Sequence, residues 1–101
     1  MALNLLNSSL AKVMYFLLDN VTLDFSKTEI ADYAGIGRAT LNRMWPSIVH
    51  YDLVVPTRKY GGTQLYKLNI ESKIVNQVAV LISTMEEKDQ DLKTTAMEIP
   101  A

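Results

Sequence analysis

The sequence predicts a mainly helical α+β fold in which a β-hairpin precedes a long C-terminal helix. Apolar residues recur at spacings of three and four near both ends of the chain. Between these ends, a helix-capping sequence is followed by a glycine turn and a further helical pattern. A Gly-Gly pair then separates two short runs with the composition of strands. These observations indicate a single small domain.

The length and composition limit the possible classes of protein. A chain of 101 residues suffices for one domain with one core. We expect residues 1–88 to form that domain, C-terminal helix included, and residues 89–101 to be a disordered acidic tail. The absence of cysteine excludes disulfides and zinc fingers and is typical of a reducing compartment. The apolar N-terminal stretch has no basic leader, so we expect a cytoplasmic protein without a membrane partner.

The charge distribution is more informative than the net charge of −1. From residue 27 to 67 there are six basic and three acidic residues, whereas after Met85 there are two basic and five acidic ones. Because the local field steers an anionic partner, the basic middle is compatible with nucleic acid. The signal is modest.

The first predicted helix runs from about Asn7 to Asn20, capped by Ser8 or Ser9. Its apolar residues fall on one stripe, which is typical of a core-facing helix. The members of this stripe are Leu6, Leu10, Val13, Met14, Leu17 and Val21.

A capping box at Ser26 and Glu29 begins the second predicted helix. Gly35 ends it, because glycine adopts the left-handed conformation that terminates helices. A third helix leaves from Gly37 and continues to His50. Two helices joined by a short glycine turn have the spacing of a helix-turn-helix.

The two faces of the third helix differ in chemistry. A helical wheel places Leu41, Met44, Trp45 and Ile48 together toward the core. The opposite side is small, polar and basic, which suits a DNA major groove, although an ordinary solvated face is the alternative. The candidate reading residues are Arg38, Ala39, Thr40, Asn42 and Arg43, with Lys27 and Ser47 as further DNA contacts.

Pro46 is unusual inside this helix. It removes one backbone hydrogen bond, so we expect the helix to kink or break near residues 42–45. Trp45 could stack on a base, but a half-buried position at the edge of the core is the preferred interpretation.

Two predicted strands, Leu53–Arg58 and Gln64–Leu68, flank the Gly-Gly turn. Pro56 restricts the first strand to an edge, or to a position where its missing donor faces away from the partner. The tip is basic and can lie on phosphates or enter a minor groove, unless its charges only protect an edge strand. The candidate residues are Arg58, Lys59, Tyr60, Gly61, Gly62 and Thr63.

The last helix, capped by Asn69 or Ser72, carries an apolar stripe with the spacing of a short coiled-coil seam. We expect it to form a homodimer interface, since one small domain does not cover so much apolar surface. The alternative is that it only closes its own core. The predicted interface residues are Ile74, Val78, Leu81, Ile82 and Met85.

The order of these motifs resembles a winged helix-turn-helix, from about Ser8 to Met85. The run LYKLNIESKIVNQVAVLI is similar to the end of many archaeal-type winged-helix transcription regulators of the broad MarR and ArsR-like group. This resemblance implies a homodimer that places residues 39–43 in the major groove and its hairpin on phosphates or the minor groove. The Trp45-Pro46 pair departs from the pattern.

The sequence therefore favours a homodimeric, sequence-specific, double-stranded DNA-binding regulator. It has no phosphate-binding loop, no nucleophile with a plausible base and no metal-ligand set, so neither an enzyme nor a cofactor is expected, and no effector can be deduced. The alternatives are a DNA-organising or plasmid-partition protein of the same fold and a protein-interaction module. Single-stranded nucleic-acid binding through Tyr60, Tyr66 and Trp45 is weaker.

Overall fold

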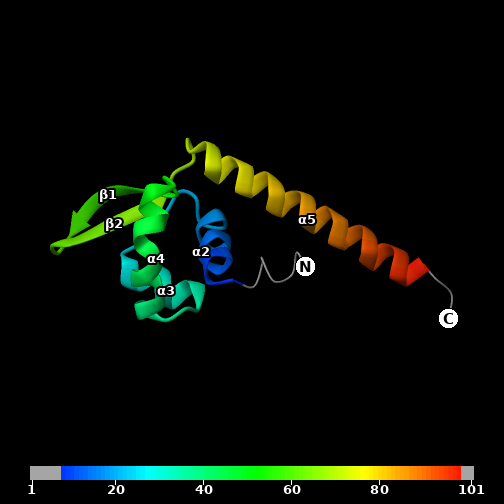
Figure 1. Ribbon diagram of the computed structural model, residues 1–101, viewed down its shortest axis with the longest axis horizontal. Helices are drawn as coiled ribbons and strands as arrows, with labels where there is room; N and C mark the ends of the chain where they lie inside the picture. Colours follow the sequence, from blue (N-terminus) through cyan, green and yellow to red (C-terminus); the bar gives the residue numbers. More distant parts are fainter. Residues whose placement is uncertain (1–7, 99–101) are drawn as a thin grey trace.

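The computed structural model describes residues 8–98, with side chains up to residue 91. Three helices form the body, a two-stranded hairpin extends from one side of it, and one long helix projects from the other (Figure 1). In chain order these elements are α2 (Ser9–Leu18), α3 (Lys27–Ala34), α4 (Arg38–His50), β1 (Val54–Tyr60), β2 (Thr63–Leu68) and α5 (Lys73–Glu98). This arrangement confirms the predicted winged-helix fold, with helix-turn-helix α3–α4 and wing β1–β2.

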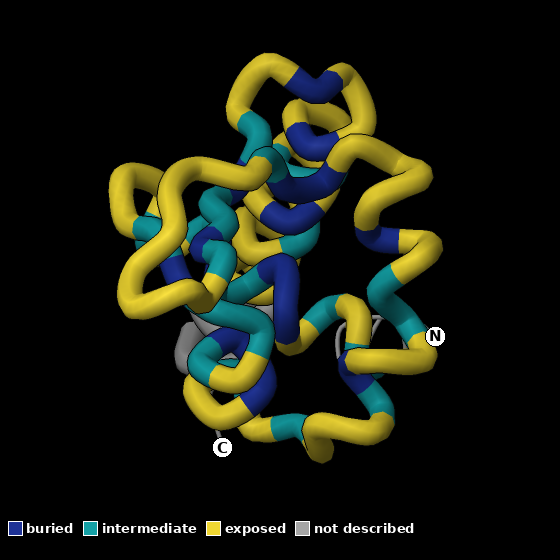
Figure 2. The backbone as a smooth tube through the Cα atoms, turned by 90° about the vertical axis from the view of Figure 1, so that its left-hand side faces the viewer, coloured by how far each residue is buried: buried dark blue, intermediate teal, exposed yellow. Residues whose placement is uncertain are grey.

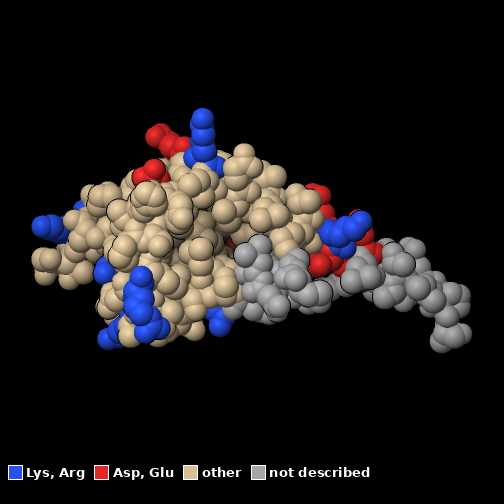
Figure 3. Space-filling model, viewed as in Figure 1, with Lys and Arg blue, Asp and Glu red and all other residues tan. Residues whose placement is uncertain are grey.

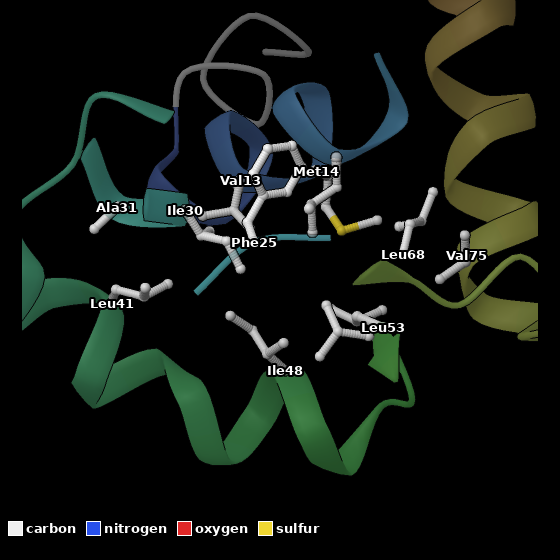
Figure 4. Packing of buried hydrophobic residues seen from close by; sticks show 12 residues of the cluster. Val13, Met14, Phe25, Ile30, Ala31, Leu41, Ile48, Leu53, Leu68 and Val75 are labelled. Atoms are coloured by element: carbon white, nitrogen blue, oxygen red, sulfur yellow. The ribbon is translucent and has the colours of Figure 1, made fainter. Parts of the chain in front are cut away.

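The core lies where α2, α3 and α4 meet. Leu17, Ile30 and Leu41 come from these three helices, and each is almost fully buried. Leu68 from β2 and Val75 from α5 extend the same cluster toward the C-terminal helix (Figure 4). Buried stretches alternate with exposed ones along the chain, and most of the outer turns are exposed (Figure 2). Of the core face predicted for the first helix, Val13, Met14 and Leu17 are buried, whereas Leu10 and Val21 are exposed and Leu6 lies outside the described residues. The face predicted for the third helix is confirmed, because Leu41 and Ile48 are buried and Met44 and Trp45 pack against the core.

Local hydrogen bonds set the ends of α3. The Glu29 backbone N–H donates to Ser26 Oγ at 3.1 Å, and the Ser26 N–H donates to Glu29 Oε1 at 2.9 Å, as the capping box predicts. At the other end Gly35 has φ +76°, and the Ile36 N–H donates to the Ala31 carbonyl at 3.0 Å. This Schellman-type ending redirects the chain within two residues, which brings α4 against α3.

The hairpin joins the body through Tyr66. Its N–H and carbonyl exchange hydrogen bonds of 2.8 and 2.7 Å with Phe25. On the edge of β2 away from Phe25, Tyr66 is paired with Pro56 of β1. The N–H and carbonyl of Tyr66 are both bonded to Phe25, so Tyr66 and Pro56 exchange no backbone hydrogen bond. The missing N–H of Pro56 therefore leaves no gap in the ladder, as predicted. The turn residues Gly61 and Gly62 have φ values of 58° and 83°, the pattern of a type I′ turn.

Two local expectations need correction. The first helix is shorter than predicted and is capped by Ser8, whose Oγ accepts from the Ala11 N–H at 3.1 Å, while Asn7 lies outside the described residues. Of the kink or break predicted near residues 42–45, the break is wrong, because α4 is one continuous helix through Pro46. Pro46 and Asn42, whose carbonyl loses its partner, both lie on the exposed side. Water can satisfy that carbonyl there, so the helix persists.

Helix α5 begins at a buried serine cap and continues far beyond the body. The Ser72 hydroxyl accepts a hydrogen bond from the Val75 N–H at 3.2 Å, which settles the choice between two predicted caps. The backbone is helical to Glu98, past the expected domain boundary at residue 88, and that boundary stays a prediction. Residues 1–7 and 99–101 lie outside the described residues.

We predict that Gly35→Ala lowers the free energy of unfolding by about 1–2 kcal/mol, because an L-residue is strained in the left-handed region. An added Cβ at Gly35 would meet no atom within 4 Å, so the loss would be conformational and not steric. Urea unfolding of the two proteins measures the difference.

Asp52 is the matched control, because it ends α4 with φ +55° without being glycine. Replacing it with glycine removes that strain, and we expect Asp52→Gly to raise the free energy of unfolding by roughly 0.5 kcal/mol after the added chain entropy is counted. If both variants changed the free energy of unfolding in the same direction, the positive φ values would not explain the choice of residue at these two positions.

Candidate nucleic-acid interface

The first half of α4 presents the predicted reading residues to solvent. Leu41 and Ile48 point into the core, so the opposite side of the helix faces outward (Figure 4). Thr40 is half-buried, and the other members of the set, Arg38, Ala39, Asn42 and Arg43, are exposed. All five lie in the first two turns of α4, next to the glycine turn. Arg38 and Thr40 lie on different sides of the helix, because residues two positions apart do not share a face.

The start of α4 adds unpaired backbone donors to this face. Gly37 is the N-cap residue, and no side chain caps the helix there. The first N–H groups of a helix point along its axis and carry the positive end of its dipole. An anionic group such as a backbone phosphate suits this position.

The tip of the hairpin is the second exposed surface. Lys59, Tyr60 and Thr63 are all exposed, and Tyr60 retains 75% of its accessible surface. A two-residue type I′ turn leaves the tip narrow and free of buried side chains. Such a tip can lie along a phosphate backbone or enter a groove.

A bulge in β1 reorients the side chains behind the tip. Pro56 pairs with Tyr66 and Lys59 pairs with Gln64, so two residues of β1 stand opposite one residue of β2. The Gln64 side-chain amide donates to the carbonyl of Arg58 at 3.3 Å within this irregular stretch. As a consequence, the consecutive side chains of Thr57 and Arg58 reach the same partner.

That partner is Asp24, in the loop before α3. Thr57 Oγ1 donates to Asp24 Oδ2 at 2.6 Å, and Arg58 Nε donates to the same oxygen at 3.1 Å. The hydroxyl bond, and then the guanidinium, hold the pKa of Asp24 below its usual range, and the carboxylate raises the pKa of Arg58. Asp24 was not among the predicted site residues, because no local sequence pattern links it to Thr57 and Arg58, which follow 33 and 34 positions later.

Arg38 is held in a similar way at the start of α4. Its Nη2 group donates to Asp32 Oδ2 of α3 at 3.1 Å, which raises the pKa of the guanidinium. Both side chains are more than half exposed, so a phosphate can compete for the arginine. Arg43 makes a longer contact of 3.4 Å to the Thr40 hydroxyl.

Lys27 and Trp45 form the junction between the helices and the hairpin. The Lys27 ammonium lies 5.0 Å from the centre of the Trp45 ring, and that ring packs edge-on against Tyr66 at 4.8 Å. Trp45 is therefore half-buried at the edge of the core, as preferred from the sequence. Lys27 is half-buried beside this ring, and Ser47 is exposed further along α4.

The charges are distributed unevenly over the molecule. In the face shown in Figure 3, basic side chains lie at the end that carries the hairpin and α4, whereas acidic and basic side chains lie side by side at the start and along the middle of α5. Within the described residues, no group of three histidine or acidic side chains is arranged to hold a metal ion. No helix among residues 8–98 is long and apolar enough to cross a membrane.

Comparison with known proteins supports the fold through structure alone. No protein-family model and no curated protein matches this sequence. Sso10a-2, a DNA-binding protein from Sulfolobus solfataricus, aligns with a TM-score of 0.58 at 13% identity over 89% of this chain and 95% of that chain. A mutant of Lactococcus lactis ZitR in its apo form aligns with a TM-score of 0.65 at 12% identity, over 93% and 74% of the two chains.

The adhesin competence repressor AdcR from Streptococcus pyogenes is also similar, with a TM-score of 0.60 at 12% identity over 89% of this chain. This chain spans 65% of the length of AdcR. At such identities the likeness establishes the winged-helix fold.

The hydrogen-bonded cluster of Asp24, Thr57 and Arg58 predicts that stability depends on pH. Because the folded-state pKa of Asp24 lies below its unfolded value of about 3.9, its stabilising effect is complete above that value and is lost as the pH falls through the folded-state pKa. We expect Asp24→Asn to be less stable than the wild type at pH 7, with the difference shrinking below about pH 4. Urea unfolding at several pH values measures this difference.

Thr57→Val provides the matched comparison, since it removes the hydroxyl bond and keeps the carboxylate. This variant should lose part of the same pH-dependent stability. A gap between wild type and Asp24→Asn that is constant from pH 3 to pH 7 would contradict the role assigned to the carboxylate.

Proposed function

We propose that this protein is a homodimeric regulator of transcription that binds double-stranded DNA in a sequence-specific way. The observation that carries the proposal is the exposed, polar and basic face of α4, which stands beside an exposed basic hairpin. Arginine can bind guanine through two hydrogen bonds, asparagine can do the same with adenine, and the methyl of Ala39 can meet thymine. Arg38, Ala39, Thr40, Asn42 and Arg43 would read bases.

The hairpin would provide the backbone contacts. Arg58, Lys59, Tyr60, Gly61, Gly62 and Thr63 would lie on phosphates or in the minor groove, with Lys27 and Ser47 as further contacts. Arg58 and Arg38 each have a carboxylate partner in the free protein. Phosphates would have to replace these carboxylates, which lowers the attraction to DNA of arbitrary sequence relative to a free arginine.

A second subunit would supply the rest of the affinity. Ile74 and Leu81 are exposed on α5, Val78 and Met85 are half-buried, and only Ile82 of the predicted interface is buried within the protomer. Two copies double the number of base and phosphate contacts and match a two-fold symmetric site. Because the structural relatives named above include DNA-binding proteins, we keep DNA as the partner and propose no cofactor.

A DNA-organising role is the second candidate. The match to almost the whole length of Sso10a-2, a DNA-binding protein, is compatible with either role, so the length of the DNA footprint has to separate them. A protein that coats DNA gives a footprint that lengthens with concentration, whereas a regulator protects one site of fixed length. A protein-interaction module would bind no duplex at moderate salt.

We predict that Arg43→Ala weakens binding to the preferred site by about 1–3 kcal/mol, roughly 5- to 150-fold in Kd, because a base contact would be lost. Discrimination against other sequences should fall as well. Fluorescence anisotropy with the preferred duplex and a scrambled duplex measures both effects.

Lys59→Ala tests the backbone contacts and should weaken binding to both duplexes alike, with a salt slope smaller by about one. Lys73→Ala, at the exposed start of α5, is the matched charge control and should bind as the wild type does. Equal losses for Arg43→Ala on both duplexes would show that α4 does not read sequence.

A further inference from the structure

Asp32 occupies one edge of the Arg38 guanidinium group and leaves another edge free. Arg38 is the first residue of α4, and its Nε and Nη2 atoms donate to Oδ1 and Oδ2 of Asp32 at 3.4 and 3.1 Å. Asp32 lies on α3, six residues earlier and on the other side of the glycine turn. The two side chains thus form a two-point contact that bridges the helices of the helix-turn-helix.

The free edge of this guanidinium carries one N–H of Nη1 and one N–H of Nη2. An arginine side chain has five N–H donors in a fixed planar arrangement, and the contact with Asp32 uses two of them. The Arg38 side chain keeps 65% of its accessible surface in spite of this contact. The free edge is therefore open to an acceptor from outside the protein.

The carboxylate of Asp32 determines which acceptors suit this edge. Guanine presents O6 and N7 side by side in the major groove, and arginine binds them through two hydrogen bonds. Because guanine is neutral, Asp32 does not repel it. A phosphate is anionic, so Asp32 repels it, and the Arg38–Asp32 pair has no net charge with which to attract it. The pair therefore favours a base edge over the DNA backbone.

The place of Arg38 in the fold also suits a base contact. In helix-turn-helix proteins, the N-terminal residues of the second helix contact the edges of the bases. Arg38 begins α4, and Asn42 follows one turn later on the same side of the helix, where it is exposed as well. A guanidinium group that is already held in position loses less side-chain freedom when it binds.

We propose that Asp32 determines specificity by positioning Arg38 for a guanine of the preferred DNA site and by opposing the use of Arg38 on phosphates. Asp32 itself touches no DNA and acts through the guanidinium group, so it is a positioning residue. This inference rests on the sequence-specific DNA binding in the proposed function. It adds the base that Arg38 reads and the residue that restricts Arg38 to that base.

Asp32→Ala separates the two kinds of contact. Alanine is the best helix former, so the variant should fold, which urea unfolding checks. Because the repulsion of phosphate is lost, we expect the affinity for a scrambled duplex to rise several-fold and its salt slope to increase by about one. The affinity for the preferred duplex should rise less, so the ratio of the two Kd values should fall roughly 3- to 10-fold.

Three further variants show whether Asp32 acts through Arg38. Glu87→Gln is the matched charge control and should leave the Kd ratio unchanged, because Glu87 is exposed in the middle of α5. Asp32→Glu keeps a carboxylate near Arg38 and should retain most of the wild-type ratio. In an Arg38→Ala background, Asp32→Ala should no longer change the ratio. A ratio that still falls there would show that Asp32 acts by another route and would overturn the inference.

The base analogue 7-deazaguanine, which lacks the N7 acceptor, identifies the guanine. Placed at each guanine of the preferred duplex in turn, it should weaken wild-type binding at the position that Arg38 reads, and should have no effect there on Arg38→Ala. The absence of such a position, or an unchanged Kd ratio in Asp32→Ala, would overturn the inference and leave sequence-specific binding intact. A wild type that prefers no duplex would instead overturn the proposed function, and this inference with it.

Discussion

The paired hydrogen bonds between Phe25 and Tyr66 fix the hairpin to the helical body, and the candidate interface depends on them. The Tyr66 ring also packs against Trp45 of α4, which lies under the Lys27 ammonium. One residue of β2 thus contacts the loop before α3 through its backbone and α4 through its side chain. This junction sets the spacing between the two surfaces that would meet a groove and its flanking phosphates.

Two arginine side chains of the candidate interface are held by carboxylates of the same chain. Asp24 and Asp32 hold Arg58 and Arg38, so two of the basic groups that would meet DNA are paired in the free protein. Fixed guanidinium groups lose less side-chain freedom on binding, while their carboxylates weaken the attraction to DNA of arbitrary sequence. Together with a net charge of −1, this arrangement favours recognition through base contacts and a second subunit over simple charge attraction.

Much of the fold was predictable because short-range rules determine it. The capping box at Ser26, the glycine turn at Gly35 and the Gly61-Gly62 hairpin each depend on residues within a few positions of one another. The helical wheel likewise separated buried Leu41 from exposed Arg43. The continuous path of α4 through Pro46 could not be deduced, since it depends on which side of the helix faces solvent. The Asp24–Arg58 ion pair could not be predicted from the sequence either, because a bulge in β1 directs the Arg58 side chain toward a residue 34 positions earlier.

In the proposed complex, the outward face of α4 would read a base sequence while the hairpin would hold the DNA backbone. The most direct test is a selection of the full-length protein against random duplex DNA at physiological salt. We expect enrichment of one consensus with two-fold symmetric half-sites, because a symmetric dimer would present two α4 helices. Recovery of duplexes without any shared sequence, at an affinity set only by salt concentration, would contradict it.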